Sequence, residues 1–204
     1  MRLLCIGDSI VSGYPFEESD SFPAVIRRIT AWEVINKGMP GATSGEIGMK
    51  FEKIFKDVAP DAVLILCGTN DALYAMLGAR VILANIKEMQ KKAEDNGAKA
   101  VLVIPALCYP HQAAASWGAL RPPETDWGTH CGVNPVEQQY IKANNILTDL
   151  RELMLEYCKE TATKCIDLQT IYKEYSKFHD GIHPTVEGYD FIGRKMAEKL
   201  SEIF

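Results

Sequence analysis

Four short segments of the chain contain residue types that together could catalyse acyl transfer. Gly7-Asp8-Ser9 places a hydroxyl directly after a short apolar run over residues 2–6. The other segments are Gly38-Met39-Pro40-Gly41, Gly68-Thr69-Asn70-Asp71 and Asp180-Gly181-Ile182-His183-Pro184. They offer a nucleophile, donors that could bind an oxyanion, and a base with a carboxylate to orient it.

Ser9 is the candidate nucleophile because it closely follows the apolar run. A serine hydroxyl is a poor nucleophile unless a neighbouring base takes its proton. Ser12, Ser19 and Ser21 lie nearby, but none of them stands at the end of such a run. From its position alone, Ser9 could equally cap the helical turn that follows. Its assignment therefore depends on a base elsewhere in the chain.

His183 is the candidate base, and Asp180 is the carboxylate that would orient it. An aspartate three residues earlier can fold back onto the imidazole Nδ1 and leave Nε2 free to face Ser9. Gly181 permits the tight backbone that this arrangement requires. The alternative is an ordinary turn before a helix whose N-cap is Thr185.

The other three histidines are weaker candidates for the base. His179 is a rival, but its neighbour Asp180 is poorly placed to orient it. His111 and His130 lie in an irregular segment and could contact substrate, although exposed loop side chains are the simpler interpretation. Cys67 lies in another apolar run, which predicts a buried and inert thiol rather than a nucleophile.

Gly41 and Asn70 are candidate oxyanion donors, together with the backbone N–H of Ser9. Gly41 follows Pro40 after a predicted strand, and its N–H could approach the reacting oxygen because no Cβ obstructs it. Asn70 offers a side-chain amide after another strand. Gly41 could instead be a turn glycine and Asn70 a cap. We expect Asp71 to organise this loop rather than to transfer protons.

These segments resemble the four signature blocks of the SGNH (GDSL-type) hydrolase family, in the family's order and over nearly the whole chain. Ile10 stands where the GDSL motif has leucine, which is a conservative apolar change. The resemblance implies no metal or other cofactor. It also implies these roles: Ser9 as nucleophile, His183 as base, Asp180 as its partner, and Gly41, Asn70 and the Ser9 N–H as oxyanion donors.

These candidates need a scaffold in which the ends of strands meet. Apolar runs of strand length lie at 2–6, 32–36, 62–67, 99–104 and 164–168, and helical patterns lie at 21–30, 44–57, 79–95, 136–161 and 185–203. Such alternation predicts an α/β fold with a parallel sheet covered on both faces. We expect one flavodoxin-like three-layer α/β/α domain over residues 1–204, with five strands in the order 2-1-3-4-5. The ends of strands 1 and 3 would then flank the switch point and bring Ser9 and Asn70 together.

Residues 107–135 depart from this alternation. The segment is rich in Gly, Pro and aromatic residues, and it lacks a clear periodicity. It is long for a plain connection within a compact domain, so we expect an irregular functional loop or lid. Its aromatic side chains Tyr109, Trp117 and Trp127 could stack on sugar rings.

Composition limits the classes of partner. The chain has 204 residues, 47% hydrophobic content and a net charge of −5, which are typical of a soluble globular protein. It lacks a basic block for nucleic acid and an apolar run long enough for a stable membrane anchor. The apolar start is too short for a signal peptide, and we expect a cytoplasmic location. The six cysteines form no Cys-x-x-Cys pair, so metal-site spacing is absent.

The sequence therefore predicts a serine esterase that acts on a small-molecule ester, with short acyl chains, by a Ser-His-Asp acyl-enzyme mechanism. One alternative is a carbohydrate O-acetyl esterase. Another is a lysophospholipase or acyl-thioesterase, which would need an extended apolar groove. A ligand-binding module on a hydrolase scaffold is the non-enzymatic alternative, although every catalytic position is occupied.

Overall fold

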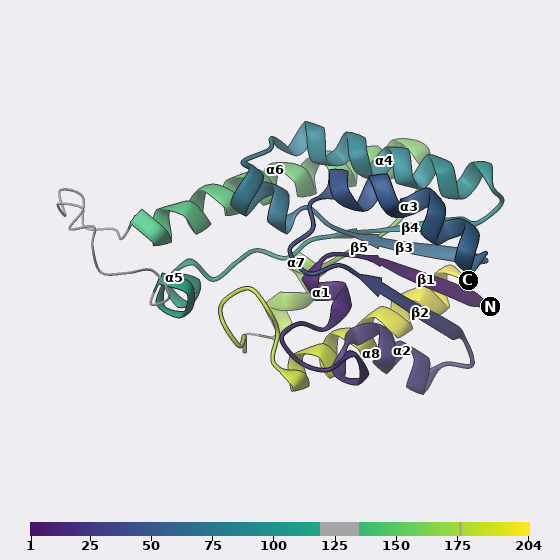
Figure 1. The fold of residues 1–204 in the computed structure, drawn as a ribbon, viewed down its shortest axis with the longest axis horizontal. Coiled ribbons are helices and arrows are strands. Elements are labelled where there is room, and N and C mark those ends of the chain that lie inside the picture. Colours follow the sequence, from purple (N-terminus) through teal and green to yellow (C-terminus); the bar gives the residue numbers. More distant parts are fainter. Residues whose placement is uncertain (119–134, 176) are drawn as a thin grey trace.

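Five parallel strands form one sheet in the order β2-β1-β3-β4-β5, as predicted (Figure 1). The computed structural model describes residues 1–118, 135–175 and 177–204. The strands are β1 (Arg2–Gly7), β2 (Glu33–Gly38), β3 (Ala62–Leu66), β4 (Lys99–Ile104) and β5 (Lys164–Asp167). Because β1 pairs with both β2 and β3, the chain order reverses at β1. This is the predicted switch point.

Helices connect the strands and cover both faces of the sheet. They are α1 (Ser9–Ser12), α2 (Phe22–Ile29), α3 (Ser44–Val58), α4 (Ala79–Asp95), α5 (Pro110–Gly118), α6 (Pro135–Thr161), α7 (Leu168–Ile171) and α8 (Val186–Ile203), with short turns η1 (Glu18–Asp20), η2 (Asp71–Ala75) and η3 (Tyr172–Glu174). Within the described residues, none of these helices combines the length and the apolar character needed to cross a membrane.

Two hydrophobic cores lie on opposite faces of the sheet. Successive side chains of a strand point to opposite faces, and in β1 Leu4 and Ile6 belong to one core while Leu3 and Cys5 belong to the other. The first core is closed by α3, α4 and α6, and the second by α2 and α8 (Figure 1). The side chains of β1 from Leu3 to Ile6 are fully buried. A strand covered on both faces needs apolar residues at every position, which explains the uninterrupted apolar runs in the sequence.

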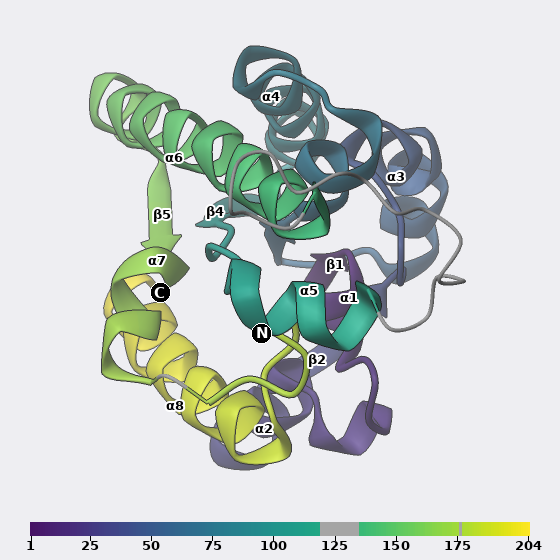
Figure 2. The same ribbon diagram turned by 90° about the vertical axis from the view of Figure 1, so that its left-hand side faces the viewer.

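The carboxyl ends of the strands meet at one edge of the sheet. Figure 2 looks onto this edge, where α1 and α5 lie in front of the strands. α1 begins two residues after β1 ends, and η2 begins five residues after β3 ends. The first turns after these two strands therefore stand side by side, as the predicted order requires.

The prediction of an irregular segment over 107–135 is wrong for its first part, because residues 110–118 form α5. Pro110 is the first residue of this helix, a position where proline needs no N–H partner. Ala113, Ala114 and Ala115 follow, and alanine has the highest helix propensity. Residues 119–134, which include Trp127, His130 and Cys131, lie outside the described residues.

Candidate active site

Ser9 is the first residue of α1, directly beyond the end of β1. Gly7 allows the end of β1 to lie close to β3, since a Cβ at Gly7 would lie 1.9 Å from the carbonyl oxygen of Leu66 in β3. Asp8 is the N-cap of α1, and its Oδ1 accepts a hydrogen bond of 3.0 Å from the N–H of Ile10. The capping role that was the alternative for Ser9 therefore belongs to Asp8, and the Ser9 hydroxyl is available to a base.

His183 and Asp180 form a hydrogen-bonded chain with Ser9. The Nε2 atom of His183 lies 2.9 Å from Ser9 Oγ, and its Nδ1 atom lies 2.7 Å from Asp180 Oδ2. All three side chains are buried, at 5–8% exposure. A carboxylate on Nδ1 favours the tautomer whose Nε2 can accept the serine proton. The three predicted residues therefore have the geometry of a catalytic triad.

The Asp180 carboxylate is held by its own turn. Its Oδ1 accepts hydrogen bonds from the N–H groups of Ile182 at 2.9 Å and His183 at 2.7 Å. Burial alone would raise the pKa of Asp180. This effect is outweighed by the hydrogen bond and charge of His183 and by these two N–H groups, so the pKa lies below its usual value. Asp180 is therefore a carboxylate at neutral pH.

Gly181 serves the packing of α5 as well as the tight turn. Its φ is +85°, and a Cβ at this position would lie 2.4 Å from the backbone nitrogen of Ala113. The carbonyl of Gly181 accepts a hydrogen bond of 2.7 Å from the N–H of Tyr109, just before α5. The turn that carries Asp180 and His183 thus supports α5 through direct backbone contact, which the sequence pattern did not indicate.

One pocket of about 270 Å³ contains the three residues that carry the candidate oxyanion donors, which are Ser9, Gly41 and Asn70. Asn70 is buried, and its Nδ2 donates one hydrogen bond of 3.0 Å to the carbonyl of Ala42, which orients the amide. Gly41 has a φ of +78°, but a Cβ there would meet nothing within 4 Å. Within the described part of the chain no atom crowds this position, and the approach of a substrate oxygen to the Gly41 N–H stays a prediction. The left-handed backbone of Gly41 is what favours glycine.

Asp71 organises the loop after β3, as expected. Its two carboxylate oxygens accept hydrogen bonds from the N–H and hydroxyl of Ser44, at 2.8 and 2.6 Å. Ser44 is the first residue of α3, so the fully buried Asp71 ties the segment of Asn70 to the start of that helix. A positioning role explains Asp71 without proton transfer.

Aromatic and apolar side chains form the remaining walls of the pocket. Tyr14, Pro40, Leu73, Tyr74, Trp117 and Ile182 line it together with the polar residues. Trp117 belonged to the predicted aromatic set, whereas Tyr14 and Tyr74 were assigned no role from the sequence. Tyr109 does not line this pocket, and its ring packs 4.6 Å from that of Phe178.

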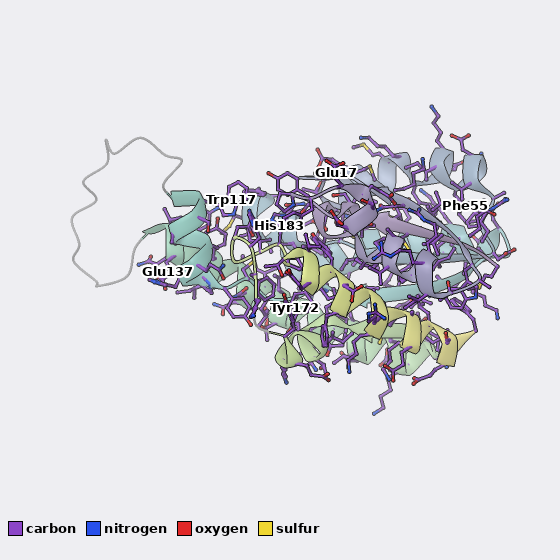
Figure 3. The ribbon with its side chains drawn as sticks, turned by 90° about the horizontal axis from the view of Figure 1, so that it is seen from below. Glu17, Phe55, Trp117, Glu137, Tyr172 and His183 are labelled. Carbon is purple, nitrogen blue, oxygen red and sulfur yellow. The ribbon has the colours of Figure 1, made fainter. Side chains whose placement is uncertain are left out.

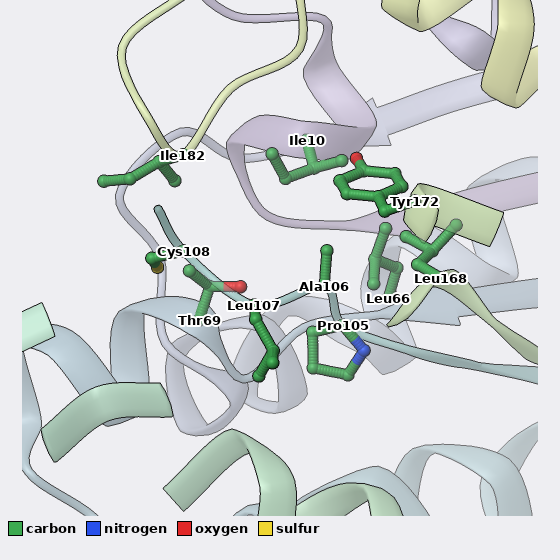
Figure 4. A pocket seen from close by; sticks show the side chains of 10 residues that line it. All are labelled: Ile10, Leu66, Thr69, Pro105, Ala106, Leu107, Cys108, Leu168, Tyr172 and Ile182. Atoms are coloured by element: carbon green, nitrogen blue, oxygen red, sulfur yellow. The ribbon is translucent and has the colours of Figure 1, made fainter. Parts of the chain in front are cut away.

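A second cavity lies behind the site and is too small for a substrate. Its volume is about 10 Å³, close to the space of one water molecule (Figure 4). Leu66, Leu168, Tyr172 and Ile182 are among the side chains that line it. The pocket that contains Ser9 is much larger, at about 270 Å³.

Asp8 is a buried carboxyl next to Ser9. Burial raises its pKa to about 6, against the Ile10 N–H and His183, which lower it, while Asp71 adds to the rise. Its Oδ2 has no hydrogen-bond partner among the described residues. Ionising the Asp8 carboxyl costs free energy, because the charge would be buried away from water.

The rival groups have no comparable arrangement. His179 is exposed, and its ring packs on Phe16 at 5.4 Å. His111 is 94% exposed and lies 3.9 Å from the Glu137 carboxylate. Cys67 is fully buried, and burial with the nearby Asp71 and Asp8 carboxylates raises the pKa of its thiol well above the usual value. Among residues 1–118, 135–175 and 177–204, no cluster of three or more His, Cys, Asp or Glu has the grouping of a metal site.

Relatives of known structure share the fold. An aryl esterase from M. smegmatis superposes with a TM-score of 0.77 at 17% identity, covering 100% of this chain and 99% of that chain. Est24, a carbohydrate acetylesterase from Sinorhizobium meliloti, has a TM-score of 0.73 at 16% identity, with the same coverage. At these identities the likeness establishes the fold alone.

Sequence comparison identifies the family. An arylesterase from Vibrio mimicus is 31% identical over 107 residues, which are 50% of this chain and 53% of the relative. This chain thus aligns with about half the length of that curated relative. Residues 5–191 match the GDSL-like lipase/acylhydrolase family and include all four signature segments. The family resemblance is confirmed over most of the sequence, and the chain belongs to the GDSL-like lipase/acylhydrolase family.

Proposed function

We propose that the protein is a serine esterase that hydrolyses short-chain carboxylic esters through an acyl-enzyme on Ser9. The observation that carries this proposal is the hydrogen-bonded chain from Asp180 through His183 to Ser9. Family membership and the pocket in front of Ser9 support it. A cytoplasmic location stays a prediction.

In the first half-reaction, Ser9 Oγ attacks the ester carbonyl carbon while His183 Nε2 takes the hydroxyl proton. The carbonyl electrons move onto its oxygen, which the Ser9 N–H, the Gly41 N–H and the Asn70 amide stabilise. The bond to the alcohol oxygen then breaks, and Nε2 returns the proton to that oxygen. The alcohol leaves, and the acyl group stays on Ser9.

In the second half-reaction, water attacks the acyl carbon and gives its proton to His183 Nε2. The same donors stabilise the second oxyanion. The bond to Ser9 Oγ breaks, and Oγ recovers the proton from Nε2 as the acid leaves. Asp180 holds the imidazolium in both halves and stays ionised.

Replacing the nucleophile tests this proposal. Ser9→Ala should lower the turnover of p-nitrophenyl acetate by about 10³-fold or more, without changing the circular dichroism spectrum. Ser19→Ala, in an exposed serine upstream of α2, is the matched control and should keep the native rate. Most of the activity surviving in Ser9→Ala would overturn the mechanism. A native protein without any turnover would favour the binding-module alternative.

The size of the pocket favours short acyl chains. A volume of about 270 Å³ lies just below the usual range of about 300–1,000 Å³ for small-molecule sites. Across a p-nitrophenyl ester series from acetate to decanoate, kcat/KM should be highest for the shortest chains and fall about tenfold by octanoate. A steady rise with chain length would instead support the lysophospholipase or thioesterase alternative.

Carbohydrate O-deacetylation is the second candidate function. Trp117 in the pocket wall favours it, because an indole face can contact the apolar face of a sugar ring. Est24, which shares the fold, is described as a carbohydrate acetylesterase. Assaying an acetylated pyranose beside p-nitrophenyl acetate compares the two substrates directly. A higher kcat/KM for the pyranose would make the carbohydrate ester the better substrate class.

A further inference from the structure

Two aromatic side chains flank the catalytic imidazole. The ring of Tyr14 stands edge-on to His183 with 5.0 Å between centroids, and the ring of Trp117 does so at 6.4 Å. Figure 3 labels Trp117 and His183, which lie next to each other at the end of the molecule that carries α5. Both aromatic side chains line the pocket that contains Ser9.

The position of Trp117 is fixed relative to His183. Trp117 lies in the last turn of α5, and α5 packs against the catalytic turn at Gly181. Gln112, in the first turn of the helix, donates a hydrogen bond of 2.8 Å to the carbonyl of Phe178. Two separate contacts therefore hold α5, and with it the indole, on the segment that carries the base.

The chemistry of acylation decides which part of an ester meets these rings. The oxyanion must face Gly41 and Asn70, whereas the alcohol oxygen must lie within reach of His183 Nε2, which protonates it. The alcohol part therefore leaves the tetrahedral carbon on the imidazole side of the pocket. Tyr14 and Trp117 are the side chains that stand against the imidazole there.

We propose that Trp117, together with Tyr14, is a specificity-determining residue that binds the alcohol part of the ester and selects a flat aromatic alcohol. This inference rests on the proposed esterase function. A phenol ring offers an aromatic face or edge to both side chains, whereas a small aliphatic alcohol leaves most of the two ring surfaces uncovered.

Two acetate esters test the inference, because phenyl acetate and ethyl acetate form the same acetyl-enzyme. Differences in kcat/KM between them report acylation and binding of the alcohol part. In Trp117→Ala, the ratio of kcat/KM for phenyl acetate to that for ethyl acetate should fall about tenfold. In Trp117→Phe, which keeps a ring, the ratio should stay within about threefold of the native value.

Ser116→Ala, in an exposed neighbour on α5, is the matched control and should keep the native ratio. An unchanged ratio in Trp117→Ala would overturn the role of Trp117, and so would an equal loss in Trp117→Phe and Trp117→Ala. Failure of the esterase proposal is recognised separately, by turnover that survives in Ser9→Ala. Inactivity of Ser9→Ala with an unchanged ratio in Trp117→Ala contradicts the specificity inference alone.

Discussion

The imidazole of His183 lies 2.9 Å from the hydroxyl of Ser9, although 174 sequence positions separate the two residues. Ser9 follows the central strand β1, and His183 belongs to the turn before the last helix, α8. Only the folded sheet brings these two ends of the chain together. The contact therefore depends on the fold. Substitutions of the residues that hold Ser9 and His183 in place should reduce activity, each by a different amount and for a different reason.

Asp180→Asn should reduce kcat by about 10³- to 10⁴-fold while the protein stays folded. An amide facing Nδ1 of His183 at 2.7 Å would stabilise the tautomer that carries its proton on Nε2, and that nitrogen could no longer accept the serine proton. Steady-state kinetics with p-nitrophenyl acetate measure the loss. Asp190→Asn, in an exposed aspartate paired with Arg194, is the control and should keep the native rate. A near-native rate in Asp180→Asn would mean that Ser9 and His183 suffice as a dyad.

Asn70→Ala should lower kcat about 10²- to 10³-fold with little change in KM, because an oxyanion donor acts mainly in the transition state. The variant also loses the hydrogen bond from Asn70 to the carbonyl of Ala42. Asn85→Ala is a useful comparison, because Asn85 donates to the Ser44 hydroxyl at 2.9 Å but does not line the catalytic pocket. Equal losses of kcat in both variants would show that loop support, rather than charge stabilisation, is the role of Asn70.

Gly181→Ala should destabilise the protein by about 2–4 kcal/mol and lower its activity. Both a left-handed backbone and the close approach of Ala113 oppose a Cβ at this position. Gly97→Ala separates the two effects, since Gly97 has a similar φ of +83° but nothing within 4 Å of its Cβ position. Chemical denaturation should give only about 1–2 kcal/mol for Gly97→Ala. Similar losses in the two variants would argue against the tight contact between the catalytic turn and α5.

Asp8→Asn should change how stability depends on pH. The pKa of Asp8 is raised to about 6 in the folded protein, whereas an unfolded aspartate titrates near pH 4. Protonated Asp8 therefore stabilises the native state fully below about pH 4, and this contribution is lost as pH rises through about 6. The wild type should lose about 2 kcal/mol relative to Asp8→Asn between pH 4 and pH 7.

The asparagine is a close match for this comparison, because its side-chain oxygen can still accept the Ile10 N–H that Asp8 Oδ1 accepts. Urea denaturation of both proteins across this pH range measures the difference in the free energy of unfolding. A difference that stays constant with pH would show that Asp8 does not titrate within this window.

The strands and the Asp180–His183 pair could be predicted because their signals are local. Ala62–Leu66 and Lys99–Ile104 are short apolar runs covered on both faces, and Asp180 and His183 have a spacing that one turn can close. The walls of the pocket could not be predicted in this way. Tyr14 and Tyr74 come from distant segments, and an aromatic residue in a loop carries no periodic signal that points toward a site.

Two further features of the site could not be predicted, because they depend on tertiary contacts. The alanines of α5 indicate a helix locally, but its contact with Gly181 appears only when the catalytic turn and the helix are seen together. The N-cap of α1 could have been either Asp8 or Ser9, since both residue types can cap a helix. Oδ1 of Asp8 accepts the hydrogen bond from the Ile10 N–H, and the Ser9 hydroxyl instead forms a hydrogen bond with His183.

The central claim, that Ser9 is the nucleophile, is tested most directly by labelling the native protein with a fluorophosphonate and mapping the modified peptide by mass spectrometry. The account predicts one stoichiometric adduct on Ser9, slower labelling in Asp180→Asn and none in Ser9→Ala. A fluorophosphonate adduct on any other residue, or a native protein that resists labelling while it still hydrolyses p-nitrophenyl acetate, would contradict it.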